Sequence, residues 1–387
     1  MALNSRGHVS TGFESIADVF GEIISNDPKM GGALSIRLGG DTVVDLWGGL
    51  ADERSGSLWE ENTLNVIFSA TKGLSSLLAA QLVQIGKLDY EALVTDYWPE
   101  FGGAGKGSTK VKHLLSHRAG LAILREDLTT EDVLDWKEIV RRLEIEEPLW
   151  IPGENHAYHA ITHGWLIGEV IRRIVGVSVG QYFRSTVAER LKADTWIGLP
   201  SSEESRVAHL HATTEWESLF TDLEDDPTPE GDFFIRGLTL GKAFPPTLAT
   251  SEGGFNERRV HAAEIPGAGG ISTARGLATI WSATVARTDG VRLLEDEVIA
   301  EATQVQSEGR PYLGGEPPYS RFGMGFQLNS PARKYLGPSS FGHDGAGGQR
   351  AFADSKHRVG FAFLTNQMGG PLDERATRLV EALRRLL

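Results

Sequence analysis

The chain contains no cysteine. Its absence excludes catalysis by a thiol, disulfide bonds and zinc sites built on cysteine. Positive charge is scarce too, because 38 lysines and arginines face 52 aspartates and glutamates, a formal net charge of −14. Nucleic acids and anionic membranes bind clustered lysine and arginine, so we expect neither as a partner.

Long apolar runs are also missing. No stretch of the sequence approaches the roughly 18 apolar residues that a membrane-spanning helix needs. Residues 1–8 lack the apolar segment of a secretory signal peptide. We therefore expect a cytoplasmic protein.

The order of the predicted elements indicates two lobes, for which 387 residues are long enough. Apolar residues at helical spacing predict helices, and alternating runs bounded by turns predict strands. The predicted helices cover 10–24, 73–85, 110–116, 130–143, 161–175, 179–191, 277–285 and 372–387. The predicted strands are a hairpin of 33–38 and 42–47, then 323–328, 340–343, 350–354 and 359–366.

This order predicts an α/β (α+β) fold, in which the two ends of the chain build a mixed, mostly antiparallel sheet flanked by helices. We expect residues 1–87 and 253–387 to form one discontinuous core domain. Residues 88–252 would be an inserted helical domain. Its stretch 203–250 is acidic, rich in Pro and Gly and weakly periodic, which predicts a lid-like loop. A site is expected in the cleft between the lobes.

Ser69-Ala70-Thr71-Lys72 is the first candidate for chemistry. Residues three apart share one face of a helix, so the Ser69 hydroxyl would lie beside the Lys72 amine. The positive end of the helix favours developing negative charge at Ser69, and a buried lysine loses its proton easily. The competing interpretation is an ordinary N-cap serine with an exposed lysine. An apolar helix follows directly, which favours a buried Lys72 beside Ser69 over an exposed one.

Two further segments carry candidate residues. A Pro-Gly turn at 152–153 precedes Tyr158, and a Tyr beside a Lys ammonium has its phenolate favoured, so it could take the serine proton. A simple packing aromatic is the alternative. Gly-rich 343–348 leaves a predicted strand, and bare backbone there can donate N–H groups to an oxyanion. A plain turn between strands is the alternative.

Taken together, these segments resemble the β-lactamase and penicillin-binding-protein superfamily. Ser69, Lys72, Tyr158 and the Gly-rich segment match, in order and spacing, class C β-lactamases and family VIII carboxylesterases. Supporting segments are Val111–Leu121, Gly269–Ala274 and Gly342–Gly348. The resemblance runs from about residue 15 to the C-terminus.

The resemblance implies a β-lactamase-like fold and a role for each residue. Ser69 would be acylated, Lys72 and Tyr158 would share the general acid and base work, and backbone N–H groups of Ser69 and Ala346 would form the oxyanion hole. Water would then release the acid, and no cofactor or metal is implied. His343, Asp344 and Gly345 would contact the substrate.

The departures from the family pattern concern the substrate. Class C enzymes have Lys-Thr-Gly where this chain has His343-Asp344-Gly345. The lysine that helps hold the anionic end of a lactam is therefore missing, and Asp344 adds a negative charge beside its position. Their Tyr-x-Asn is here Tyr158-His159-Ala160, so the asparagine that would hold an amide side chain is absent. The loss of the lysine and of the asparagine favours neutral esters over lactams and peptides. A Ser-Asp-Asn segment is also missing, which argues against the class A arrangement.

Two other patterns suggest rival chemistry. Gly176–Gly180 fits the Gly-x-Ser-x-Gly nucleophile elbow, but the preceding segment is amphipathic at helical spacing, so Ser178 is interpreted as an N-cap. His156, His159 and His163, with Glu154, could suggest zinc. His156 lies before the predicted helix, which removes it from the face of the others.

We therefore expect a serine carboxylesterase for small to medium esters. Trp150, Phe68, His159 and the segment 203–250 are expected to shape its pocket. The alternatives are a β-lactamase or D-alanyl carboxypeptidase, acyl transfer to an alcohol, and a non-catalytic binding module of the same fold.

Overall fold

The computed structural model describes residues 5–224, 228–312, 314–370 and 372–387. The helices are α1 (Glu14–Asn26), α2 (Ala70–Gln84), α3 (Val111–Leu115), α4 (Thr130–Leu134), α5 (Trp136–Ile145), α6 (Thr162–Val175), α7 (Val179–Phe183), α8 (Glu189–Leu191), α9 (Thr214–Glu224), α10 (Pro229–Thr239), α11 (Arg258–Ala262), α12 (Ala274–Val285), α13 (Asp296–Ala302) and α14 (Arg375–Arg384). The strands are β1 (Arg6–Val9), β2 (Gly31–Leu38), β3 (Asp41–Asp52), β4 (Ser57–Leu58), β5 (Asn65–Val66), β6 (Thr195–Ile197), β7 (His211–Ala212), β8 (Gly270–Ser272), β9 (Arg321–Phe322), β10 (Gln327–Leu328), β11 (Ser340–Asp344), β12 (Arg350–Asp354), β13 (Val359–Thr365) and β14 (Gln367–Met368).

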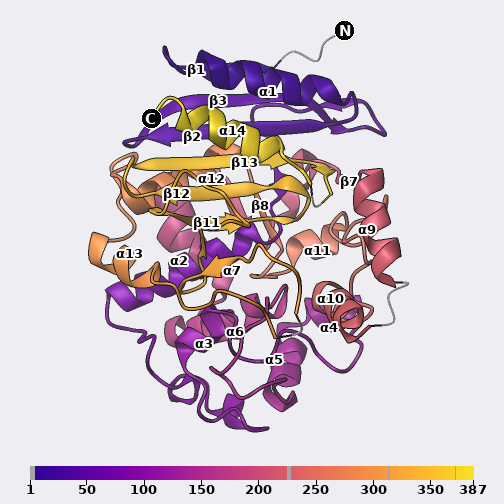
Figure 1. The fold of residues 1–387 in the computed structure, drawn as a ribbon, viewed down its shortest axis with the longest axis vertical. Helices are drawn as coiled ribbons and strands as arrows, with labels where there is room; N and C mark the ends of the chain where they lie inside the picture. Colours follow the sequence, from indigo (N-terminus) through magenta and orange to yellow (C-terminus); the bar gives the residue numbers. More distant parts are fainter. Residues whose placement is uncertain (1–4, 225–227, 313, 371) are drawn as a thin grey trace.

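The main sheet joins the two ends of the chain. Its order is β1-β3-β2-β13-β12-β11-β10-β9, with β4 added beside β3, and its pairings among the described residues are antiparallel. The predicted hairpin forms, and β2 then pairs with β13 over Gly32–Leu38 and Val359–Thr365. Figure 1 shows the strands from the N-terminal and C-terminal parts side by side. The prediction of helices around a mostly antiparallel sheet is confirmed.

Alternation along β13 places different side chains on the two faces of the sheet. Phe361 and Phe363 join one buried core with residues of α1 and α14. Ala362 and Leu364 point the other way and belong to the larger core that contains α12 and α2. Small residues on this second face let the helices approach the sheet closely.

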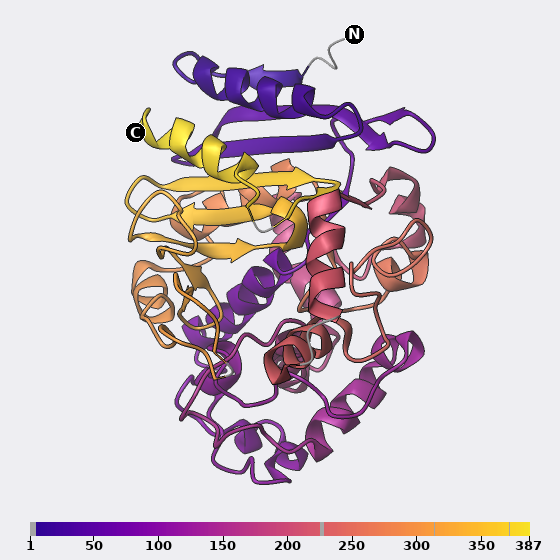
Figure 2. The ribbon, with the colours of Figure 1, turned by 45° about the vertical axis from the view of Figure 1, so that its right-hand side comes forward.

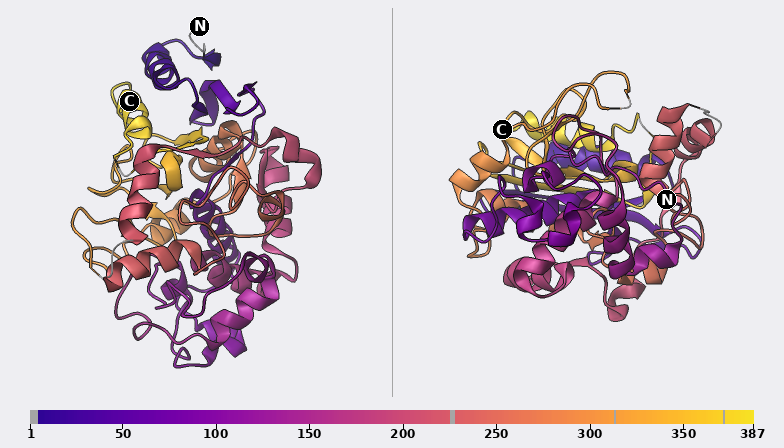
Figure 3. Two further views of the ribbon diagram at one scale, coloured as in Figure 1. Left: turned by 90° about the vertical axis from the view of Figure 1, so that its right-hand side faces the viewer. Right: turned by 90° about the horizontal axis from the view of Figure 1, so that it is seen from below.

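Helix α2 lies at the centre of the molecule. Every residue from Ala70 to Leu82 is buried, so this helix has no solvent-exposed face until its last turn. Figures 1 and 3 show the main sheet on one side of it and the helices α3, α4, α5 and α6 at the opposite end of the molecule. The start of α2 therefore lies where the two parts of the molecule meet.

Several predicted elements need correction. The single helix 130–143 is two, because Asp135 is extended, ends α4 and caps α5 by accepting from the N–H groups of Lys137 and Glu138. Helix 179–191 is interrupted by a π-helical turn at Arg184–Ala188. In place of the strand 323–328, only β10 is extended.

The prediction that 203–250 forms a loop is wrong, because this segment contains the helices α9 and α10. Thr228 caps α10, and Pro229 sits in its first turn, where proline is compatible with a helix. Figure 2 brings α9 and α10 forward, beside the ends of the C-terminal strands. Residues 225–227 lie outside the described part of the chain.

The division into two domains stays a prediction. Among the described residues, two strand pairings cross the proposed boundary, since β6 pairs with β8 and β7 pairs in parallel with β14. In the described residues, no helix is both long and apolar enough to span a membrane.

Candidate active site

A strained turn presents Ser69 at the start of α2. Phe68 has φ of 44°, a left-handed conformation that a non-glycine residue adopts at an energetic cost. The Thr71 hydroxyl fixes this turn by donating to the Phe68 carbonyl at 2.6 Å and accepting from the Gly270 N–H at 2.8 Å. The turn brings the Ser69 side chain to the floor of a cleft.

The Ser69 hydroxyl is not used to cap the helix. Its oxygen accepts no hydrogen bond from the first N–H groups of α2. Instead it lies 3.1 Å from Lys72 Nζ, and its interaction with Tyr158 lowers the pKa of that phenol. The N-cap interpretation therefore does not describe this residue, and its hydroxyl is free to react.

Lys72 is fully buried and held by backbone carbonyls. Its Nζ donates to the Ala160 carbonyl at 2.5 Å and to the Gly267 carbonyl at 2.7 Å. Burial lowers the pKa of Lys72 well below its usual value. A neutral amine has two N–H donors for these carbonyls and one lone pair for the Ser69 hydroxyl. The geometry thus matches a base ready to accept the serine proton.

Tyr158 lies in the loop before α6, against both Lys72 and His117. The centre of its ring is 4.9 Å from Lys72 Nζ and 4.8 Å from the His117 ring. Burial raises the pKa of Tyr158, while the hydrogen bond with Ser69 opposes that effect. The expected phenolate is therefore not the resting state: the phenol keeps its proton and can donate it.

His343, on β11, faces Tyr158 with ring centres 6.0 Å apart. Its Nδ1 lies 2.7 Å from the Asp344 carbonyl, which can only accept, so Nδ1 carries the proton. Burial lowers the pKa of His343 to about 3, with smaller contributions from Lys72 and Arg333. His343 is therefore a neutral imidazole.

The turn after β11 brings bare backbone close to Ser69. A Cβ atom on Gly345 would lie 2.2 Å from the Ile67 carbonyl, so only glycine fits there. Ala346 then begins the 3₁₀ turn η5 (Ala346–Gly348). Among the described residues, neither the Ser69 N–H nor the Ala346 N–H has a hydrogen-bond acceptor. Two such donors beside a nucleophile can stabilise an oxyanion.

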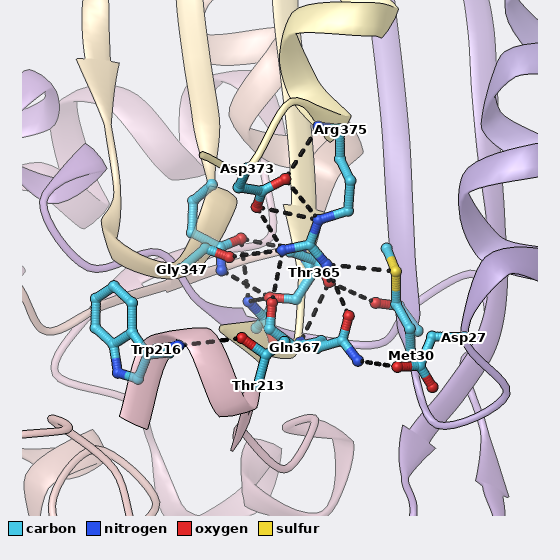
Figure 4. A network of polar contacts seen from close by, with 12 residues as sticks. Asp27, Met30, Thr213, Trp216, Gly347, Thr365, Gln367, Asp373 and Arg375 are labelled. Atoms are coloured by element: carbon cyan, nitrogen blue, oxygen red, sulfur yellow. Dashed lines mark hydrogen bonds and ion pairs between the residues drawn. The ribbon is translucent and has the colours of Figure 1, made fainter. Parts of the chain in front are cut away.

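Arg375 holds the η5 turn in place (Figure 4). Its Nη2 donates to the Gly347 carbonyl at 3.1 Å and to the Gln367 carbonyl at 2.9 Å. Asp373 binds the same guanidinium, with Nε 2.9 Å from Oδ1. The start of α14 is thereby tied to the residues that follow Ala346, a contact that the sequence did not suggest.

The cleft has a volume of about 750 Å³ and two unlike walls. Ser69, Tyr158, His343, Asp344, Gly345 and Ala346 line it, so the structure brings these predicted residues together. The other wall is apolar and comes from α9 and α10, within the segment 203–250 that was expected to shape the pocket. The sequence reasoning did not name its residues, which are Trp216, Leu219, Phe220, Phe233, Phe234 and Leu238. Trp216, Leu219 and Phe220 have the helical spacing that could have revealed it.

Three predicted pocket residues do not line the cleft. Phe68 is buried and packs edge-on against Phe255, with ring centres 5.1 Å apart. Both ring nitrogens of buried His159 are engaged by the backbone of Leu121 and Ala157. Trp150 is buried and donates to a carbonyl at 3.2 Å. Their aromatic character marked a core and not a substrate surface.

The rival patterns have structural explanations. Gly176 ends α6 in a left-handed conformation, and Ser178 caps α7 by accepting from the Gln181 N–H. The Ser178 hydroxyl also donates to Glu264. A hollow of about 310 Å³ lies beside Glu264, but Ser178 is not among its lining residues. Among the residues that the structure describes, no three His, Asp or Glu side chains are grouped to hold a metal ion.

The chain is similar to several known proteins over nearly its whole length. A family model described as beta-lactamase matches residues 20–384. The esterase/beta-lactamase LipL of Mycobacterium tuberculosis is 32% identical over 364 residues, which cover 93% of this chain and 82% of that protein. The crystal structure of a family VIII carboxylesterase superposes with a TM-score of 0.87 at 33% identity, covering 99% of this chain and 100% of that one. A penicillin-binding protein homologue from Caulobacter crescentus gives a TM-score of 0.86 at 32% identity, with coverage of 99% and 100%.

Proposed function

The chain belongs to the beta-lactamase family, and on this premise we propose that it is a serine carboxylesterase of the family VIII type. It is an enzyme, a hydrolase with the esterase/beta-lactamase fold. The observation that carries the proposal is the Ser69 hydroxyl, which lies between the Lys72 amine and the Tyr158 phenol and caps no helix. Its substrates are small to medium carboxylic esters.

Acylation begins when neutral Lys72 takes the proton of the Ser69 hydroxyl. The serine oxygen then attacks the ester carbonyl, and the oxyanion accepts from the N–H groups of Ser69 and Ala346. Tyr158 passes its proton to the leaving alcohol oxygen as the carbon–oxygen bond breaks, and it is reprotonated from Lys72. The products of this step are the free alcohol and an ester on Ser69.

Deacylation repeats these steps with water in place of the serine. Neutral Lys72 removes a proton from water, which attacks the acyl carbon. Tyr158 donates its proton to the leaving serine oxygen and is reprotonated from Lys72. The carboxylic acid is released and the resting site is restored. The protein's own groups supply every proton transfer, so the proposal includes no cofactor.

Direct comparison of an ester with a lactam tests this proposal. We expect kcat/KM for p-nitrophenyl butyrate to exceed that for a chromogenic cephalosporin by at least about a hundredfold, because the lysine and asparagine that anchor lactams are replaced by His343 and Ala160. A relative whose name joins esterase and beta-lactamase makes lactam hydrolysis the second candidate. Faster turnover of the cephalosporin would favour that candidate over ours.

Arg375 is expected to act as a positioning residue in this reaction. Arg375→Ala removes the donor to the Gly347 carbonyl, so the Ala346 N–H would lose its alignment. We expect kcat for p-nitrophenyl butyrate to fall roughly ten- to a hundredfold with KM little changed. Arg378→Ala is the control, because Arg378 lies on the same helix and pairs with Glu22 at the surface. Equal loss in both variants, in step with their melting temperatures, would indicate a structural effect only.

A further inference from the structure

The charge at the polar wall of the cleft differs from what the sequence suggested. Asp344 looked like a carboxylate added beside the reacting centre. In the structure, buried Arg350 places Nε 3.3 Å and Nη2 3.2 Å from Asp344 Oδ2. The Tyr335 hydroxyl donates to the other oxygen, Oδ1, at 3.1 Å. Asp344 is therefore already paired within the protein, and the Asp344–Arg350 pair adds no net charge to the cleft.

Arg333 is a second cation beside Asp344, and its charge is not needed to neutralise that carboxylate. Its Nε lies 3.6 Å from Asp344 Oδ2, beyond hydrogen-bond length. Among the described residues, the one hydrogen bond of its side chain goes to the adjacent Ala332 carbonyl. The side chain is 46% exposed and lines the cleft. A guanidinium has five N–H donors, and most of those on Arg333 are unused.

Arg333 is close to the reacting groups. It lowers the pKa of Tyr158 and of His343, with smaller effects than burial, and at Tyr158 Asp344 opposes it with a smaller effect still. The carboxylates that line the rest of the cleft are elsewhere: Glu230 and Glu316 are exposed residues of α10 and of the loop before β9. Asp373 is paired with Arg375. The unbalanced charge beside Tyr158 is thus positive, although the chain as a whole is negative.

The position of Arg333 indicates that it contacts the alcohol part of the ester and not the acyl part. Tyr158 is the group that delivers a proton to the leaving oxygen in the proposed mechanism. Arg333 lies 3.6 Å from Asp344, and the preceding residue, His343, faces Tyr158 with ring centres 6.0 Å apart. The apolar wall of α9 and α10 is left for the acyl group. One surplus guanidinium matches a monoanion such as a carboxylate, which it can bind through two parallel hydrogen bonds.

We propose that Arg333 forms an anion subsite, and that the substrates are O-acylated hydroxy acids, whose alcohol part carries a carboxylate. This rests on the proposed esterase function and adds its substrate class. Hydrolysis adds water across the acyl carbon–oxygen bond, so an apolar carboxylic acid and a free hydroxy acid are released. The sequence suggested a preference for neutral esters because of Asp344. The structure replaces it with a preference for esters whose alcohol part carries a carboxylate.

Matched pairs of esters test this subsite. The butyrate esters of glycolate, 3-hydroxypropanoate and 4-hydroxybutyrate would each be compared with the corresponding carboxamide, which has the same shape without the charge. Butyrate release would be measured for the wild type, Arg333→Gln and Arg321→Gln. Arg321 is the control, because it is also 46% exposed but pairs with Glu308 and does not line the cleft.

We expect the wild type to prefer the acid for at least one spacer length. In Arg333→Gln, kcat/KM for that acid should fall about ten- to a hundredfold, mainly through KM, while the amide changes less than about threefold. Arg321→Gln should keep the wild-type ratio. Raising the salt concentration should reduce the ratio of kcat/KM for the acid to kcat/KM for the amide, because salt screens the half-exposed charge of Arg333.

Three results would contradict the subsite. The first is that Arg333→Gln hydrolyses the amides and leaves the ratio of kcat/KM for the acid to kcat/KM for the amide unchanged. This result would refute the subsite but not the esterase proposal. The second is a preference that depends on Arg333 but appears only when the carboxylate is on the acyl side, as in monoethyl glutarate. The third is no Ser69-dependent hydrolysis of any ester, including p-nitrophenyl butyrate, which would overturn the esterase proposal as well.

Discussion

Ser69→Ala is expected to reduce the hydrolysis of p-nitrophenyl butyrate by about a thousandfold or more, because the acyl-enzyme can no longer form. The variant should fold normally, since the hydroxyl caps no helix. A fluorophosphonate probe, which labels activated serines, should modify the wild type and not the variant. Absence of labelling in the wild type would instead favour a non-catalytic binding module.

Ser178→Ala is the matched control for this experiment. Ser178 accepts from the Gln181 N–H and donates to Glu264, so its loss should lower the free energy of unfolding by about 1 kcal/mol. The activity of the folded protein should stay close to that of the wild type. Activity that survives Ser69→Ala and disappears with Ser178→Ala would refute the assignment of the nucleophile.

Lys72→Met is expected to lower kcat for the same ester by about 10²- to 10⁴-fold, because the general base is lost. In the wild type, Lys72 is active as a neutral amine. The rate should therefore fall as the pH falls through the lowered pKa of Lys72, and rise above it. Lys87→Met removes an exposed lysine just after α2 and should retain both the rate and its pH profile.

The same variant tests the protonation state of Lys72 without any substrate. The folded protein holds Lys72 neutral at pH values where the unfolded chain binds a proton, so this group makes the wild type more stable as pH rises. Between the folded and unfolded pKa values of Lys72, the wild type should gain about 1.4 kcal/mol per pH unit relative to Lys72→Met. Denaturant unfolding at several pH values measures this slope. A difference that is constant with pH would mean that Lys72 stays protonated in the fold.

Local patterns account for what the sequence could predict. The alternation at 33–47 and at 350–366 gave the central strands because both faces of the sheet are packed, which constrains each position. Ser69 and Lys72 were predictable because their contact depends on helix geometry alone. Tyr158 and the Gly-rich turn followed from order and spacing along the chain.

The remaining features depend on contacts between distant segments. Nothing near Arg333 or Arg375 marks them as cleft residues, because their partners Asp344 and Gly347 come from other elements. The Tyr158 protonation state followed from burial, which a short motif does not encode. Pro and Gly in 203–250 suggested a loop because their positions at helix ends were not recognised.

The pairing of β2 with β13 constrains the order of events during synthesis. Leu38 ends β2 and pairs with Val359, so the N-terminal hairpin keeps an open edge until more than three hundred further residues have been made. At a translation rate of about 5–20 residues per second, this interval lasts roughly 15–65 seconds. An unpaired edge can bind other chains during that time, so β2 is a site where a nascent chain needs protection from aggregation. Because η5 follows β11 and is held by Arg375 of α14, the active site can form only after α14 has been synthesised.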